Sequence, residues 1–322
     1  MLGMETSIEV RDLRKRYRGA VAVDGLSFTV RAGEVTGFIG PNGAGKSTTM
    51  RLILGLDAAD GGTALVGGAD YRTLRAPLTH VGALLDPGAV HPGRRGRDHL
   101  LWMAHSNGIS RRRVDEVLDQ VGLTSAAKRR AGTYSLGMQQ RLGIAAALLG
   151  DPPVLLLDEP VNGLDPDGIV WIRELLRSLA AEGRVVLVSS HLMSELEDTA
   201  DHLVIIGRGK LVADTSVAKL LAAASKDRVE VRTAQRTEAM TVLANAGATV
   251  SVTGSDTVIV EGLAADGIGG LLADNGVAFS ELRRHRASLE EAYMELTRSS
   301  VEFTPTSAAA PSDGGAVEGA SR

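Results

Sequence analysis

The stretch VTGFIGPNGAGKSTTM, residues 35–50, places an apolar run directly before a glycine-rich turn that contains one lysine. Gly40, Gly45, Lys46 and Ser47 match the phosphate-binding pattern Gly-x-x-x-x-Gly-Lys-Ser. The residues before the turn read as a strand and those after it as a helix, which is the context that this pattern requires. A glycine-rich turn without a ligand is the alternative, and this context argues against it. The sequence therefore predicts a nucleotide phosphate site in an α/β fold.

The chemistry of this turn follows from its residue types. Glycines let backbone N–H groups turn toward phosphate oxygens, and the start of the helix adds partial positive charge. Lys46 can reach the β- and γ-phosphates, and the Ser47 hydroxyl can bind Mg²⁺. We expect the phosphate-binding loop to consist of Gly40, Pro41, Asn42, Gly43, Ala44, Gly45, Lys46, Ser47 and Thr48.

Two further apolar runs end in polar residues. PPVLLLDEP, residues 152–160, would deliver Asp158 and Glu159 at the carboxyl edge of a parallel sheet, where such sheets bind ligands. Asp158 is suited to Mg²⁺ and Glu159 to polarising the attacking water, although a charge pair at a helix start is the alternative. RVVLVSSHL, residues 184–192, places His191 in the same way. We interpret His191 as a γ-phosphate contact, with a purely structural histidine as the alternative.

Residues 93–150 have apolar spacing typical of helices and no clear strand. Within them, Ser135 is a candidate helix N-cap, and Gly137 would let a phosphate approach the first helical turn. This pattern indicates a second anion-binding helix start, although one nucleotide already has a complete phosphate-binding loop.

Composition narrows the class of protein. A chain of 322 residues suggests two domains. Without cysteine it can form no disulfide and no thiolate metal site. A net charge of −4 gives no general affinity for nucleic acid, so we expect no nucleic-acid partner. No apolar run is long enough to cross a bilayer, and the first residues lack an apolar leader segment, so we expect a cytoplasmic location.

Several motifs occur in one order downstream of Tyr17: GPNGAGKST at 40–48, YSLGMQQR at 134–141, LLLDEP at 155–160, GLD at 163–165 and SSHLMSE at 189–195. This order resembles the ATPases of ATP-binding cassette (ABC) transporters over residues 5 to about 220. The resemblance implies a P-loop NTPase fold with a helical subdomain, ATP and Mg²⁺ as ligands, and a head-to-tail homodimer. In that dimer each ATP would lie between one phosphate-binding loop and the partner's segment 134–138.

The resemblance also implies roles for single residues. Tyr17 would stack on adenine, and Asp165 would couple the two sites of the dimer. Glu159 would be the general base, with Lys46 and His191 contacting the γ-phosphate. The partner's nucleotide would be bound by Ser135, Gly137 and Met138.

Two motifs depart from the family pattern. The usual signature Leu-Ser-Gly-Gly-Gln is here Tyr-Ser-Leu-Gly-Met at 134–138, which changes its shape and removes a polar contact at Met138. The family's Q-loop glutamine appears as Asp86, which has a shorter reach and a charge. We expect Asp86 to contact Mg²⁺ or water, together with Ser47 and Asp158.

The last third of the chain changes in composition near residue 225. We expect an ATPase domain at 5–222, a small α/β domain at 226–299 with a regulatory or dimer-supporting role, and a disordered tail at 300–322. Substrate binding is the alternative role for the small domain.

The whole pattern, with the ending SLEEAYMELT at 288–297, resembles the ATP-binding subunits of two-component drug exporters of the daunorubicin/doxorubicin-resistance type. This resemblance implies an ATPase on the cytoplasmic face of the membrane that drives efflux through a separate permease. A cassette of an importer and a soluble cassette ATPase acting on ribosomes or DNA are the alternatives.

Overall fold

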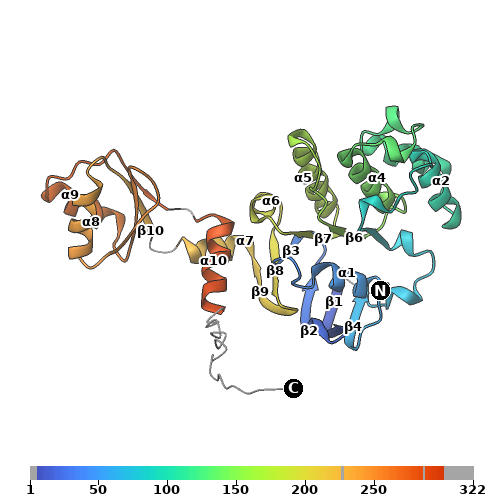
Figure 1. The fold of residues 1–322 in the computed structure, drawn as a ribbon, viewed down its shortest axis with the longest axis horizontal. Helices are drawn as coiled ribbons and strands as arrows, with labels where there is room; N and C mark the ends of the chain where they lie inside the picture. Colours follow the sequence, from blue (N-terminus) through green and yellow to red (C-terminus); the bar gives the residue numbers. More distant parts are fainter. Residues whose placement is uncertain (1–5, 226–227, 286, 301–322) are drawn as a thin grey trace, which may run out of the picture.

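The computed structural model describes residues 6–225, 228–285 and 287–300. It contains a larger α/β part and a smaller one, with the helices α7 (Val217–Ala224) and α10 (Leu289–Ser300) between them (Figure 1). The predicted α/β class is confirmed. Within the described ranges, no helix has the length and apolar composition needed to span a membrane.

A six-stranded sheet forms the centre of the larger part. Its order is β5 (Val81–Leu84), β6 (Val154–Asp158), β7 (Val185–Ser190), β3 (Val35–Ile39), β8 (His202–Gly207) and β9 (Lys210–Ser216). The strands pair in parallel except for β9, which is antiparallel to β8. Every residue of β3, β6 and β7 is buried, as their apolar sequences predict. In register, Asp158 pairs with Ser189 and Ile39 with Ser190, so the three following segments begin at one edge.

A second sheet packs below the first (Figure 1). It is antiparallel, with the order β2 (Ala20–Val30), β1 (Ile8–Tyr17) and β4 (Gly61–Val66). One apolar cluster joins both sheets and α1 (Lys46–Ile53), and it contains Phe28, Phe38 and Met50. The ring centroids of Phe28 and Phe38 lie 5.4 Å apart. This core fixes the helix that follows the phosphate-binding loop.

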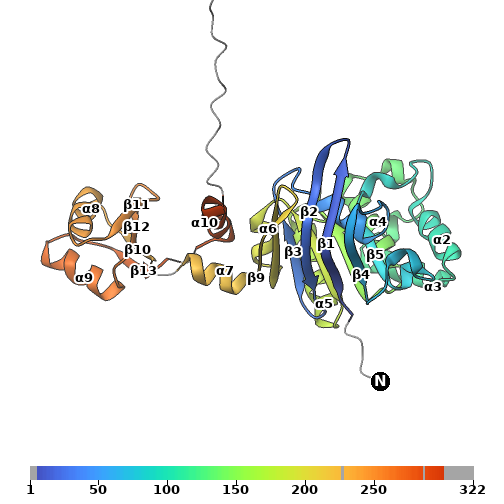
Figure 2. The same cartoon turned by 90° about the horizontal axis from the view of Figure 1, so that it is seen from below.

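Helices cover the opposite face of the central sheet, as Figure 2 also shows from below. They are α2 (Gly96–Ser106), α3 (Arg111–Gln120), α4 (Leu136–Leu148) and α5 (Pro166–Ala181). The first three lie in the stretch 93–150 whose apolar spacing indicates helices. Their buried residues, including Leu100, Val117 and Leu142, join the larger apolar cluster of the chain.

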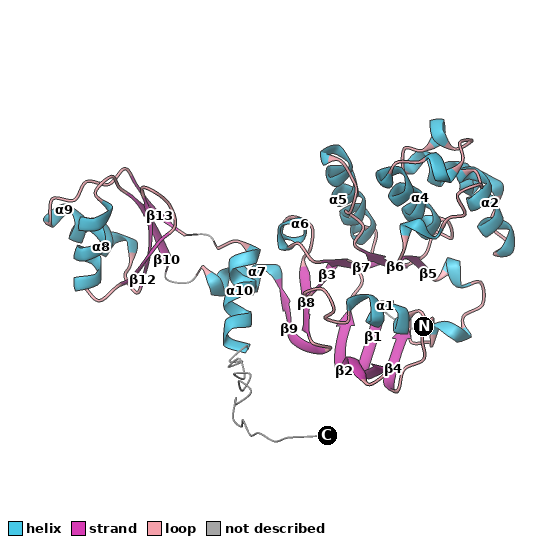
Figure 3. Cartoon of the chain, in the orientation of Figure 1, coloured by secondary structure: helices cyan, strands magenta, loops and turns pink. Residues whose placement is uncertain are grey.

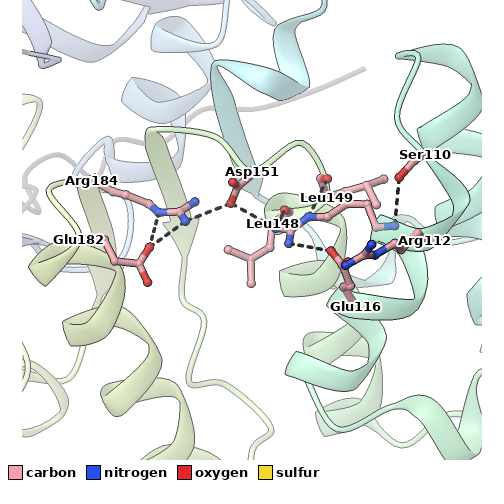
Figure 4. A network of polar contacts seen from close by, with 9 residues as sticks. Ser110, Arg112, Glu116, Leu148, Leu149, Asp151, Glu182 and Arg184 are labelled. Carbon is pink, nitrogen blue, oxygen red and sulfur yellow. Dashed lines mark hydrogen bonds and ion pairs between the residues drawn. The ribbon is translucent and has the colours of Figure 1, made fainter.

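A polar network ties the end of α4 to its neighbours (Figure 4). Asp151 lies 3.0 Å from Nη2 of Arg184 and 3.3 Å from Nη2 of Arg113. Arg113 also donates to the carbonyl oxygen of Leu148 at 2.9 Å, which satisfies the last turn of α4. The network thereby fixes the end of α4, with the loop that follows it, against α3 and against Arg184, the residue before β7.

The smaller part is a four-stranded antiparallel sheet with the order β11 (Thr249–Val252), β12 (Thr257–Glu261), β10 (Arg228–Arg232) and β13 (Glu281–Arg284). Two helices, α8 (Arg236–Asn245) and α9 (Ala265–Asp274), pack on the side that faces away from α10 (Figure 3). The chain order is a split β-α-β arrangement. Val229, Val231, Val258 and Val260 fill the core under the helices.

The apolar face of helix α10 packs on the larger part, and an ion pair between Arg228 and Glu295, at 3.2 Å, joins α10 to this sheet. The helix contacts α7 and the short helix α6 (Met193–Glu197), and it buries Leu289 and Ala292 in the core of the larger part. Its first turn is held by a hydrogen bond from the backbone N–H of Leu289 to Glu197 Oε2, at 2.9 Å. The expected small domain at 226–299 therefore differs from the structure at its end, because the apolar face of α10 packs on α7. The expected tail lies outside the described residues, apart from Ser300 at the end of α10.

Candidate nucleotide-binding site

The glycine-rich turn joins the end of β3 to the start of α1. Gly43 and Gly45 adopt φ values of +80° and +107°, which only glycine tolerates readily. A Cβ at Gly45 would lie 2.4 Å from the carbonyl oxygen of Ala22, and one at Gly40 would lie 2.5 Å from that of Ile206. Gly40 and Gly45 must therefore be glycine, because neighbouring backbone leaves no room for a Cβ.

Lys46 occupies the base of the turn with 7% of its surface exposed. Its Nζ donates to the carbonyl oxygen of Gly40 at 2.7 Å and lies 3.9 Å from Glu159 Oε1. The turn encloses a pocket of about 290 Å³ lined by Ala22, Pro41, Asn42, Gly43, Ala44, Gly45, Lys46, Ser47, Thr48 and Glu159. The expected loop and the expected base therefore share one pocket.

The pocket fits a phosphate group. No side chain caps the start of α1, so its first backbone N–H groups are available to an anion. Lys46 brings a buried positive charge to the same place, and the exposed Ser47 follows it in the first turn of the helix.

Hydrogen bonds connect the ends of β6 and β7 beside this pocket. The hydroxyl of Ser189 donates to Asp158 Oδ1 and accepts the backbone N–H of Glu159 at 2.9 Å. Glu159 Oε2 lies 2.8 Å from His191 Nδ1. The structure thus brings together Lys46, Glu159 and His191, the three residues expected to act on the γ-phosphate.

Ser135 begins α4 and accepts a hydrogen bond from the backbone N–H of Met138 at 3.3 Å, so it is the N-cap that the sequence predicts. A Cβ at Gly137 would lie 2.9 Å from the carbonyl oxygen of Gly163. Tyr134 is buried, and its hydroxyl donates to the carbonyl oxygen of Ala126 at 2.8 Å. Ser135, Gly137 and Met138 are not among the residues that line the pocket at the glycine-rich turn.

Tyr17 is exposed at the end of β1 and also lies outside the lining of that pocket. Its hydroxyl donates to Asp57 Oδ2 at 2.6 Å, and Arg51 Nε donates to the same oxygen at 2.8 Å. The hydrogen bonds from Arg51 and Tyr17 lower the pKa of Asp57 to about 2, and the bond to Asp57 raises the pKa of Tyr17. Arg51 belongs to α1, so Tyr17 is anchored to the helix that follows the glycine-rich turn.

Asp86 and Asp165 cap short segments of backbone. Asp86 Oδ1 accepts the N–H of Gly88 at 2.8 Å at the start of a 3₁₀ turn, and Asp165 Oδ1 accepts the N–H of Gly168 at 2.9 Å at the start of α5. Neither contributes to the lining of the pocket. Over the ranges that the structure describes, no three His, Cys, Asp or Glu side chains form a group that could hold a metal by themselves.

Sequence reasoning missed Gln140. It is 1% exposed on α4, and its Nε2 donates to the carbonyl oxygen of Glu159 at 3.1 Å. The available signal was an amide one helical turn before the apolar and buried Ile144, on the same face of α4.

Comparisons with known proteins agree with this geometry. A family model described as "ABC transporter" matches residues 23–162, and a domain of unknown function, DUF8746, matches residues 227–290. The bacitracin transport ATP-binding protein BcrA of Bacillus licheniformis is 42% identical over 214 residues, which cover 66% of this chain and 70% of that protein.

Two further likenesses extend over nearly the full chain. The daunorubicin resistance ATP-binding protein DrrA2 of Streptomyces coeruleorubidus is 33% identical over 320 residues, or 94% of this chain and 99% of that protein. A solved structure of the ATP-binding subunit of an ABC transporter has a TM-score of 0.65 and 25% identity, and the match covers 91% of this chain and 100% of that one. The chain therefore belongs to the ATP-binding proteins of ABC transporters, and it is an ATPase of that family.

Proposed function

We propose that this ATPase powers export of a drug or secondary metabolite through a separate membrane permease, from the cytoplasmic face of the membrane. The observation that carries the ATPase part of the proposal is that Lys46 and Glu159 line one pocket at the glycine-rich turn and that His191 contacts Glu159 there. Export is supported by relatives whose names refer to bacitracin transport and daunorubicin resistance, the second of them similar along its full length.

Hydrolysis in this pocket follows from the positions of its charged groups. Backbone N–H groups of the glycine-rich turn and of the start of α1 bind the β- and γ-phosphates, and the Lys46 ammonium neutralises their charge. The Glu159 carboxylate takes a proton from the attacking water, and His191, held against Glu159, contacts the γ-phosphate. Mg²⁺, when bound, would be held by Ser47 and Asp158 and would neutralise phosphate charge, with the remaining ligands supplied by the nucleotide and water. Neither Asp158 nor Asp86 lines the pocket, but Asp158 directly precedes Glu159, which does, whereas Asp86 caps a 3₁₀ turn elsewhere, so Asp86 is the weaker of the expected metal ligands.

A second copy of the chain completes the site in this proposal. Ser135, Gly137 and Met138 lie outside the pocket of their own chain, although the start of α4 has the features of an anion site. A head-to-tail homodimer would place this helix start on the partner's nucleotide, with Asp165 beside the junction. Tyr17 would stack on the adenine, in the orientation that Asp57 gives its ring.

The test uses the ATPase together with its permease in reconstituted vesicles. The Lys46→Ala variant should lose ATP binding, because the buried ammonium is the pocket's main positive charge. The Glu159→Gln variant should bind ATP normally but hydrolyse it about 10²-fold more slowly, since a general base typically contributes 10²–10⁴-fold. Both should lose export.

Glu182→Gln provides the matched control, because Glu182 pairs with Arg184 away from the pocket. It makes the same chemical change as Glu159→Gln, and it should leave hydrolysis and export unchanged. Normal export by either pocket variant would refute the proposal.

A further inference from the structure

Gln140 connects α4 to the backbone of Glu159. The side chain is buried, and its Nε2 lies 3.1 Å from the carbonyl oxygen of Glu159. A carbonyl oxygen only accepts hydrogen bonds, so the amide nitrogen must be the atom that faces it. The carbonyl oxygen of Glu159 therefore sets the orientation of the Gln140 amide.

Glu159 itself has a strained backbone. Its φ is +50°, in the left-handed region, which costs an L-residue roughly 1–2 kcal/mol. The strained peptide is held on both sides. Its N–H donates to Ser189 Oγ at 2.9 Å, and its carbonyl oxygen accepts from the backbone N–H of Asn162 at 3.2 Å as well as from Gln140. These bonds determine the direction in which the Glu159 carboxylate leaves the chain.

The stability of the fold does not account for a glutamine at position 140. Its Oε1 is buried and has no hydrogen-bond partner among the described residues. A buried unpaired acceptor costs about 1–3 kcal/mol, so an apolar side chain of similar length would fold as well or better. The carbonyl of Glu159 would keep its bond to Asn162 after such a change. A role in holding Glu159 does explain the amide.

We propose that Gln140 is a positioning residue for hydrolysis: its amide holds the strained Glu159 peptide so that the carboxylate faces Lys46 and His191. This inference rests on the proposed role of Glu159 as the general base. It also adds a link between sites, because Gln140 belongs to the helix that begins at Ser135. In the proposed dimer, the helix that contacts one nucleotide through Ser135 positions the base that acts on the other.

The test replaces the amide by an apolar side chain of nearly equal size. In the Gln140→Met variant, kcat for ATP hydrolysis should fall about tenfold or more, because small displacements of a catalytic group are costly. KM for ATP and the midpoint of thermal unfolding should stay unchanged, since Gln140 neither lines the pocket nor stabilises the fold. A role in packing alone would instead lower the unfolding midpoint and leave kcat intact.

Gln139→Met is the matched control, with the same substitution one position earlier on α4. Gln139 donates to the carbonyl oxygen of Tyr134 at 3.4 Å and has no contact with Glu159 among the described residues. Its kcat should match that of the unaltered protein. Gln140→Leu serves as a second apolar variant at the site, and loss of folding in both Gln140 variants would overturn the inference.

Measuring Glu159→Gln in the same assay separates the two proposals. If Glu159→Gln hydrolyses ATP normally, the proposed role of Glu159 fails, and the inference about Gln140 fails with it. If Glu159→Gln stalls while a folded Gln140 variant keeps full kcat, only the inference fails. A higher KM with unchanged kcat in the Gln140 variants would also overturn it, because the residue would then act on binding.

Discussion

The carboxylate of Asp57 fastens the exposed ring of Tyr17 to α1. It accepts hydrogen bonds from the Tyr17 hydroxyl and from Arg51, and both favour the charged form of Asp57. Their result is a pKa of about 2 instead of the usual 3.8. The anchor of the proposed adenine platform is therefore a charged group whose contribution to folding depends on pH.

Replacing Asp57 by Asn should destabilise the protein only where the carboxylate is charged. The folded-state pKa is lowered, so the stabilisation is fully present above the unfolded-state pKa of 3.8 and is lost as pH falls toward 2. The measurement is the free energy of unfolding of both proteins by urea at several pH values. The difference between them should be constant above about pH 5 and should shrink steadily below pH 4. A difference that does not change down to pH 2.5 would contradict the assignment.

Single residues also show what a sequence can locate. The placement of Lys46 and Glu159 at one pocket could be predicted, because each belongs to a short motif at the carboxyl end of a buried strand. Gln140 could not be predicted, because its function depends on a contact between a helix and a strand end. The sequence also gives no sign that Tyr134 is buried, because its hydroxyl is satisfied by the carbonyl oxygen of Ala126, which only the folded chain brings near.

Ser135 is the N-cap of α4, and it is also proposed to contact the nucleotide of the partner subunit. Ser135 accepts the N–H of Met138, and Ser110 accepts the N–H of Arg113 at the start of α3, both at 3.3 Å. Either Ser→Ala change should cost about 1 kcal/mol of unfolding free energy, as loss of an N-cap does. Only Ser135→Ala should also lower ATP turnover, by about tenfold, because a hydrogen bond to a charged phosphate is worth roughly 1.5–3 kcal/mol.

The pair is compared by urea unfolding and by steady-state ATPase assays. Because the two caps have the same geometry, general destabilisation should affect both variants alike. Equal turnover in the two variants would show that the start of α4 acts only as a cap.

Elements differ in how well a sequence can place them. The apolar runs of β3, β6 and β7 predict buried parallel strands, and the order of their polar ends follows from that geometry. The apolar spacing of α10 predicts a helix but does not identify its neighbour. Leu289 and Ala292 could cover either the four-stranded sheet or α7, and only the folded chain places them on α7.

The four-stranded unit is inserted between two helices that pack together. Its entry and exit lie side by side, because Ser225 Oγ accepts the backbone N–H of Ala287 at 2.9 Å and the N–H of His285 donates to the carbonyl oxygen of Arg228 at 2.9 Å. The unit has its own apolar core, which includes Val231 and Leu272. The ATPase part therefore depends on α10 for its packing more directly than on the sheet that precedes α10.

Two shortened chains test this arrangement. In the first, residues 228–284 are replaced by a linker of about four glycine and serine residues, which the adjacent ends can accommodate. In the second, the chain stops after Ser225 and so lacks α10. The second should unfold roughly 5–10 °C lower, because burial of Leu289 and its neighbours on α7 contributes about 2–3 kcal/mol. The first should keep both its unfolding midpoint and its affinity for ATP. If the two chains instead unfold at the same lowered temperature, the inserted sheet itself stabilises the ATPase part, and α10 is not the element that completes its core.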